Sequence, residues 1–134
     1  MNKEIAVKWL KQAKHDLDIA EKNISIGGYD VAAFLSHQSV EKLLKSIFAF
    51  EGKSIPKIHY IDELGKKLHL KKEILDDVID LTIDYTFSRY PDVTEKIPYE
   101  IYDENTAKAK VEKAKRIFYQ IENRYKKFVK NEEG

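Results

Sequence analysis

The chain has 134 residues, enough for one hydrophobic core, so we expect a single domain spanning residues 1–134. Hydrophobic residues make up 43% and charged residues 35%, a composition that excludes an intrinsically disordered chain. The net charge is only +1, from 24 basic and 23 acidic residues, so no overall positive field attracts a polyanion. Any contact with nucleic acid therefore has to come from a local patch.

The sequence contains no cysteine, which excludes disulfide bonds and thiolate metal sites and fits a reducing compartment. The first residues are charged throughout and lack the apolar core of a signal peptide. No apolar run approaches the roughly 20 residues that a membrane-spanning helix needs. We therefore expect a cytoplasmic protein with no membrane partner.

Two long helices are predicted in the first part of the chain. Apolar residues recur three or four positions apart over residues 3–25, which indicates one buried stripe. Gly27 or Gly28 ends this helix, because glycine readily adopts the left-handed conformation that closes a helix. The second helix is expected from about Tyr29 to Phe50, before a connector that contains a glycine and a proline.

The second part of the chain predicts a short helix over Ile61–Leu68 and a longer one over about Lys71–Phe87. The segment from Ser88 to about Tyr102 contains two prolines and no period, so we expect it to be irregular. A last helix should run from near Asp103 to about Lys130. No run alternates as a strand, so four long helices and one short helix predict an all-α fold, an up-and-down antiparallel bundle.

The second helix carries a polar stripe whose role its spacing leaves open. His37, Glu41 and Lys45 are four positions apart and share one face, with Gln38 and Lys42 beside them. One interpretation is a solvated helix face with an ordinary Glu41–Lys45 ion pair. The other is the lining of a polar cleft, in which these side chains contact a ligand.

Other chemistry has little support in the sequence. The four histidines show no ligand spacing with each other or with a carboxylate, so we expect no metal site. Gly27 and Gly28 lack the surrounding pattern of a phosphate-binding loop. The serines of the second helix have no partners that would activate a nucleophile. We therefore assign no catalytic residue and no cofactor.

The run "SRYPDV", residues 88–93, holds the most informative arginine of the chain. Arg89 follows a predicted helix, and Pro91 prevents that helix from continuing. In one interpretation Arg89 binds phosphate with its two-pronged guanidinium, while Tyr90 and Tyr99 supply aromatic surface for a base. In the other, Arg89 closes the helix C-terminus and Tyr90 packs inward.

Four segments together resemble the HEPN family (higher eukaryote and prokaryote nucleotide-binding) in its RYPD-bearing branch. They are "WLKQAKHDLDIAE", "GGYDVAAFLSHQSVEKLLKSIF", "EGKSIPKIHYIDEL" and "DYTFSRYPDV", and the resemblance covers residues 5 to about 127. It implies an up-and-down helical bundle that forms a symmetric homodimer. It also implies binding of nucleotides or RNA, often beside a separate minimal nucleotidyltransferase in toxin–antitoxin-like pairs.

The family's ribonuclease members carry an arginine and then, after four to six residues, a histidine. Arg89 matches the arginine, but the histidine positions hold Thr94, Glu95 and Lys96. The site then has a phosphate-binding group without the base that takes the 2′-hydroxyl proton. His37 or His59 could replace that base only if the fold brings one of them to Arg89.

The sequence therefore predicts a homodimeric module that binds a nucleotide or an RNA phosphate near Arg89, with a nucleotidyltransferase as its expected protein partner. The alternatives are a metal-independent endoribonuclease and a non-catalytic protein-interaction bundle. The candidate ligand-binding residues are Arg89, Tyr90, Asp92, His37, Lys42 and Lys45.

Overall fold

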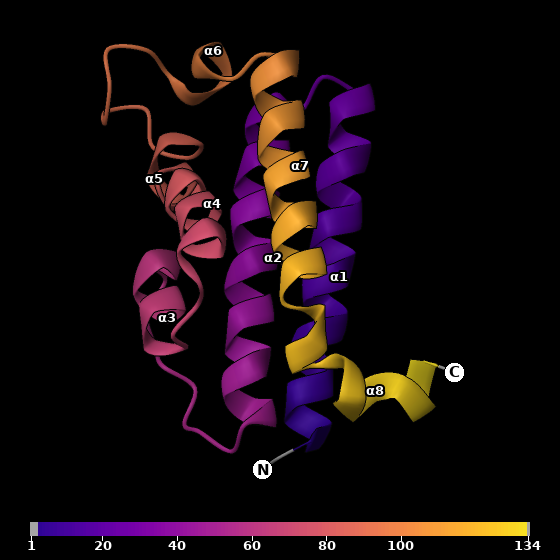
Figure 1. Ribbon diagram of the computed structural model, residues 1–134. Coiled ribbons are helices and arrows are strands. Elements are labelled where there is room, and N and C mark those ends of the chain that lie inside the picture. The colour runs from indigo at the N-terminus through magenta and orange to yellow at the C-terminus, as the bar shows by residue number, and fades with distance from the viewer. Residues whose placement is uncertain (1–2, 134) are drawn as a thin grey trace.

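Helices account for every regular element in the described part of the chain. The computed structural model describes the backbone of residues 3–133 and the side chains of residues 3–129 (Figure 1). The elements are α1 (Lys3–Ser25), α2 (Tyr29–Phe50), α3 (Ile61–Lys67), α4 (Lys72–Thr82), α5 (Asp84–Phe87), α6 (Pro98–Ile101), α7 (Glu104–Gln120), the 3-10 turn η1 (Glu122–Arg124) and α8 (Lys126–Glu133). This arrangement confirms the all-α bundle.

Helix α2 lies at the centre of the bundle. It contacts α1 and α7 on one side and α3, α4 and α5 on the other, and Figure 1 shows these two groups flanking it. Most of its residues are buried, including Glu41, Lys45 and Ser46 in its C-terminal half. An α-helix buried on most of its surface is typical of the central element of a domain. The side chains of α2 that face α5 therefore lie inside the protein.

The predicted helix over Lys71–Phe87 is broken into α4 and α5 at Ile83. The hydroxyl of Thr82 donates a hydrogen bond to the carbonyl oxygen of Val78, 3.1 Å away. Such a bond from a side chain to its own helix bends the helix. Ile83 is 51% exposed at the break, whereas Asp84, the first residue of α5, is completely buried. The break therefore turns α5 inward toward α2.

The predicted last helix is also interrupted. It begins as expected, because Asp103 Oδ1 accepts a hydrogen bond from the backbone N–H of Thr106 at 2.8 Å. It stops at Gln120, where Ile121 leaves helical geometry with φ of −110°. In the next turn Arg124 forms an ion pair with Glu51 at the end of α2. The tertiary contact anchors this turn, and the chain resumes as α8.

The segment that begins with Arg89 is irregular except for α6. Proline at the first position of that single turn is compatible with a helix start, since its missing N–H would be unpaired there in any case. Among the described residues no helix is long and apolar enough to cross a membrane.

Candidate functional site

The polar stripe of α2 is buried, so the interpretation as a solvated face is wrong. His37 has no exposed surface, and Glu41 and Lys45 are each 5% exposed. Glu41 Oε2 accepts a hydrogen bond from Lys45 Nζ at 3.0 Å and lies 3.0 Å from Nδ1 of His59. The cause is tertiary, because Tyr85 of α5 packs on His37, His59 of the connector after α2 contacts Glu41, and Lys45 lies over Trp9 of α1. The stripe lines the contact between α2 and the segment that leads to Arg89.

The ring of Tyr85 in α5 is the centre of the site. Its centroid lies 5.2 Å from the ring of His37 and 5.3 Å from the ring of His59, which stacks on it nearly parallel. The guanidinium carbon of Arg89 lies 4.2 Å from the same centroid. The fold therefore brings both histidines to the aromatic ring that Arg89 contacts. We call Phe34, His37, Glu41, His59, Tyr85 and Arg89 the Tyr85 cluster.

Arg89 makes the capping bond that one interpretation expected, but this bond uses only one of its N–H groups. Its Nε donates to the carbonyl oxygen of Tyr85 at 2.9 Å, in the last turn of α5. The guanidinium also lies 4.9 Å from the ring of Phe34 and 4.8 Å from the ring of Tyr90, within cation–π range. Its Nη2 is buried and has no hydrogen-bond partner among the described residues.

His37 is held in its neutral form. Burial is the largest cause that lowers its pKa from 6.5 to about 4, and the positive charge of Arg89 acts in the same direction. The charge of Glu41 and a contact with Gln38 oppose this effect in part. The His37 Nδ1 atom lies 3.2 Å from Oε1 of Gln38. An amide oxygen only accepts, so Nδ1 carries the proton and Nε2 presents a lone pair.

The remaining predicted residues lie around or outside this cluster. Lys42 forms an ion pair with the buried Asp16 of α1, so its side chain points away from Arg89's partners. Lys45 is in the stripe, paired with Glu41 and 5.7 Å from the ring of Trp9. Tyr90 is 45% exposed beside the guanidinium and does not pack inward. The side chain of Asp92 is exposed in the loop.

The sequence interpretation missed Phe34, Tyr85 and the position of His59. A signal for Tyr85 was present, because it lies in the last turn of the predicted helix, four residues before Arg89, where a side chain that closes the helix end would reach. No local pattern could place His59, which comes from the connector between α2 and α3.

A buried carboxylate closes the loop that follows Arg89. The hydroxyl of Tyr102 donates to Asp84 Oδ1 at 2.5 Å, and Lys110 Nζ lies 3.0 Å from Asp84 Oδ2. Burial raises the pKa of Asp84, and Lys110 and Tyr102 oppose that effect. Ser88, just before Arg89, donates to the backbone carbonyl of Asp84. These contacts hold the two ends of the loop, residues 88 and 102, against one residue.

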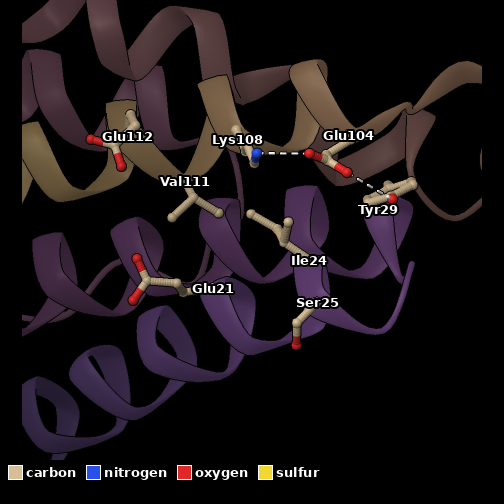
Figure 2. A pocket seen from close by; sticks show the side chains of 8 residues that line it. All are labelled: Glu21, Ile24, Ser25, Tyr29, Glu104, Lys108, Val111 and Glu112. Atoms are coloured by element: carbon tan, nitrogen blue, oxygen red, sulfur yellow. Dashed lines mark hydrogen bonds and ion pairs between the residues drawn. The ribbon is translucent and has the colours of Figure 1, made fainter.

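A groove of about 560 Å³ lies elsewhere, between the end of α1, the start of α2 and the first half of α7 (Figure 2). All three of its carboxylates are already paired, since Glu104 contacts Lys108 at 2.7 Å, and Glu21 and Glu112 both contact Lys115. It contains none of the predicted ligand-binding residues. Among the residues whose side chains are described, no group of histidine and carboxylate ligands could hold a metal ion.

Comparison with known proteins supports the resemblance to the HEPN family. The HEPN domain profile matches residues 6–124. The crystal structure of TT1696 from Thermus thermophilus superimposes with a TM-score of 0.83 at 26% identity, over 92% of this chain and 99% of that one. ST0689, an archaeal HEPN homologue, gives a TM-score of 0.73 at 37% identity, over 88% of this chain and 95% of that one. No curated protein matches the sequence. The chain therefore belongs to the HEPN domain family.

Proposed function

We propose that this protein binds the phosphate of a nucleotide or of RNA at Arg89. The observation that carries the proposal is the buried Nη2 of Arg89, which has no partner among the described residues. A buried donor without an acceptor costs about 1–3 kcal/mol, and a charged donor costs more. Phosphate oxygens are strong acceptors that match a guanidinium.

The surroundings of Arg89 favour an anion. The Nε bond to Tyr85 fixes the orientation of the guanidinium, so little side-chain entropy remains to be lost on binding. His37 adds no charge at neutral pH, and the charge of Lys45 is balanced by Glu41. Tyr90, exposed beside the guanidinium, offers a face on which a base can stack.

Replacing Arg89 should weaken ligand binding and leave the stability of the fold nearly unchanged. In Arg89→Ala the affinity for a nucleotide or short RNA should fall about tenfold or more, because a charge-assisted contact is worth about 1.5–3 kcal/mol. The melting temperature should change little. The substitution removes a capping bond worth about 0.3–1 kcal/mol and cation–π contacts, but it also removes a buried unpaired donor that costs about 1–3 kcal/mol. Arg116→Ala is the matched control, because Arg116 of α7 is half exposed and pairs with Asp77 of α4, outside the Tyr85 cluster.

Two outcomes would contradict this proposal. One is a wild-type protein that binds neither nucleotide nor RNA in titrations. The other is an Arg89→Ala variant whose melting temperature falls sharply while the remaining folded protein binds as before. The second result would favour the non-catalytic interaction bundle, with Arg89 serving structure alone.

We also propose that the protein acts as a homodimer and pairs with a minimal nucleotidyltransferase, in a toxin–antitoxin-like system of the RYPD-bearing branch. Support for an interface comes from exposed apolar side chains in the segments around Arg89. These are Ile79, Ile83, Tyr90, Val93, Ile97 and Tyr99, which are 37–69% exposed. Light scattering at micromolar concentration should give twice the monomer mass. A monomer mass would contradict the proposed homodimer. Co-purification with the product of a neighbouring gene tests the proposed pairing with a nucleotidyltransferase.

One observation favours metal-independent RNA cleavage as a second candidate function. His59 is 56% exposed at its side chain, and its Nδ1 is held by Glu41, which leaves Nε2 to act as a base. Cleavage would transfer the proton of the 2′-hydroxyl to that nitrogen while the 2′-oxygen bonds to phosphorus and the P–O5′ bond breaks. The products would be a 2′,3′-cyclic phosphate and a 5′-hydroxyl protonated from water, and Arg89 would stabilise the charge on the phosphate during the step.

We still expect weak or absent cleavage, because Thr94, Glu95 and Lys96 stand where the family's histidine belongs. The test is incubation of RNA with the protein in EDTA. Robust cleavage that both Arg89→Ala and His59→Ala abolish would make the second candidate the better one.

A further inference from the structure

The turn between α3 and α4 breaks several local rules of helix structure. His69 has a φ of 57°, a left-handed conformation that residues with a side chain rarely adopt. Glycine usually occupies this position after a helix, because it has no Cβ to clash. Lys71 is in the capping position of α4 without a side-chain capping bond, and Lys72 follows it, although the positive end of a helix dipole repels cations. Natural proteins break such rules mainly at functional sites.

The same turn carries positive charges that have no partner within the protein. We give the name basic turn to Lys66, Lys67, His69, Lys71 and Lys72, all of which are exposed. The ion pairs between described side chains involve other lysines. Asp62 and Glu63 stand one helical turn before Lys66 and Lys67 but do not pair with them. Because the whole chain has a net charge of only +1, this excess is local and attracts a negatively charged partner.

A hollow of about 160 Å³ adjoins the basic turn. His69 and Lys71 line it on one side, and the end of α7 with the turn η1 lines it on the other. Part of its lining is apolar and comes from Leu70, Ile74 and Ile121. A cavity of about 150 Å³ with apolar walls holds a group the size of benzene. The hollow therefore has room for one apolar side chain.

The lining fits a protein segment better than a nucleic acid. The guanidinium of Arg124 already bonds Glu51 and the carbonyl oxygen of Leu68, so it offers no free fork to a phosphate. The described residues that line the hollow include no phenylalanine, tyrosine or tryptophan on which a base would stack. We propose that the basic turn and the hollow bind an acidic segment of a partner protein, whose carboxylates contact the lysines while one apolar side chain enters the hollow.

This surface is separate from the site around Arg89. It shares no residue with the Tyr85 cluster or with the exposed apolar side chains around Arg89. The inference therefore does not rest on the proposed phosphate site, and each can fail without the other.

The experiment measures fluorescence anisotropy of a labelled nine-residue peptide of aspartate and glutamate with one central leucine. Binding should weaken with salt, and a peptide with serine in place of leucine should bind about tenfold more weakly, because it leaves the hollow unfilled. Lys66→Glu/Lys71→Glu should weaken binding of the leucine peptide about tenfold or more, since like charges then face each other. Lys11→Glu/Lys22→Glu is the matched control, because it makes the same change of charge at exposed positions of α1, on the other side of α2 (Figure 1).

His69→Gly separates binding from stability. Glycine adopts a φ of 57° without a steric cost, so the melting temperature should stay the same or rise. The affinity for the leucine peptide should fall about fivefold, because the variant removes a ring that lines the hollow. A variant that binds the peptide as tightly as the wild type would count against the inference.

Oligonucleotides of nine uridines or nine thymidines form the second arm. Tyr119 lines a neighbouring hollow and is 78% exposed, so stacking on a base has to be tested. Tighter binding of an oligonucleotide than of the peptide, lost in Lys66→Glu/Lys71→Glu, would assign the surface to nucleic acid and overturn the inference. No peptide binding by the wild type, equal binding of the leucine and serine peptides, or equal affinities in the two double variants would overturn it as well.

Discussion

Acidification should destabilise this protein through His37, because the ring is completely buried and its protonated form would lose solvation. Burial is the main cause that lowers the pKa of His37 from 6.5 to about 4 in the folded state. The unfolded chain therefore binds a proton below its pKa, near pH 6.5, whereas the folded chain does so only near pH 4. The contribution of His37 to stability is complete above that window and is lost as the pH falls through it.

The size of the effect follows from the two pKa values. Their difference corresponds to roughly 3 kcal/mol when the pH has fallen to 4, and about 2 kcal/mol of it is lost between pH 7 and pH 5. Domains of this size are usually stable by only about 5–15 kcal/mol. A loss of this magnitude is therefore measurable by denaturant unfolding.

The assay is urea unfolding of the wild type and of His37→Phe at pH 7 and pH 5. All other side chains are the same in the two proteins, so the difference between their pH dependences isolates His37. The wild type should lose about 2 kcal/mol more than the variant over this interval. His15→Phe is the matched control, because it makes the same substitution at an exposed position outside the Tyr85 cluster. A His37→Phe variant that loses stability as steeply as the wild type would refute the reasoning.

Two further predictions concern side chains that hold the framework of the site. Tyr102→Phe should destabilise the fold by about 1–3 kcal/mol, because it removes a donor from the buried Asp84, whereas Tyr119→Phe, at a 78% exposed position, should have no effect in thermal melting. Arg124→Ala should cost about 1–3 kcal/mol in urea unfolding, since Arg124 bonds both Glu51 oxygens and the carbonyl of Leu68. Arg116→Ala, which breaks an exposed pair, should cost at most about 1 kcal/mol, and equal losses in the two arginine variants would contradict this ranking.

The sequence by itself determined the class of the fold and the positions of the main helices. The apolar period over residues 3–25 and the stop at Gly27 predicted α1, and Asp103 marked the start of α7. These features are local, because a repeat of three or four residues and a capping side chain act within one helix. The order of the four quoted segments was also enough to identify the family, which the matched profile confirms.

Only the tertiary structure decided whether the stripe of α2 is solvated or buried. A helical period tells which side chains share a face, but it does not tell what covers that face. The covering residues, His59, Tyr85 and Arg89, come from separate segments later in the chain. The breaks at Ile83 and Ile121 escaped the sequence because the apolar period continues through both points. A hydrogen bond from Thr82 to its own helix accompanies the first break, and the contact of Arg124 with Glu51 anchors the turn after the second. The sequence by itself singled out Arg89 as a candidate residue, whereas the assembly of the Tyr85 cluster around it depends on packing between segments far apart in the sequence.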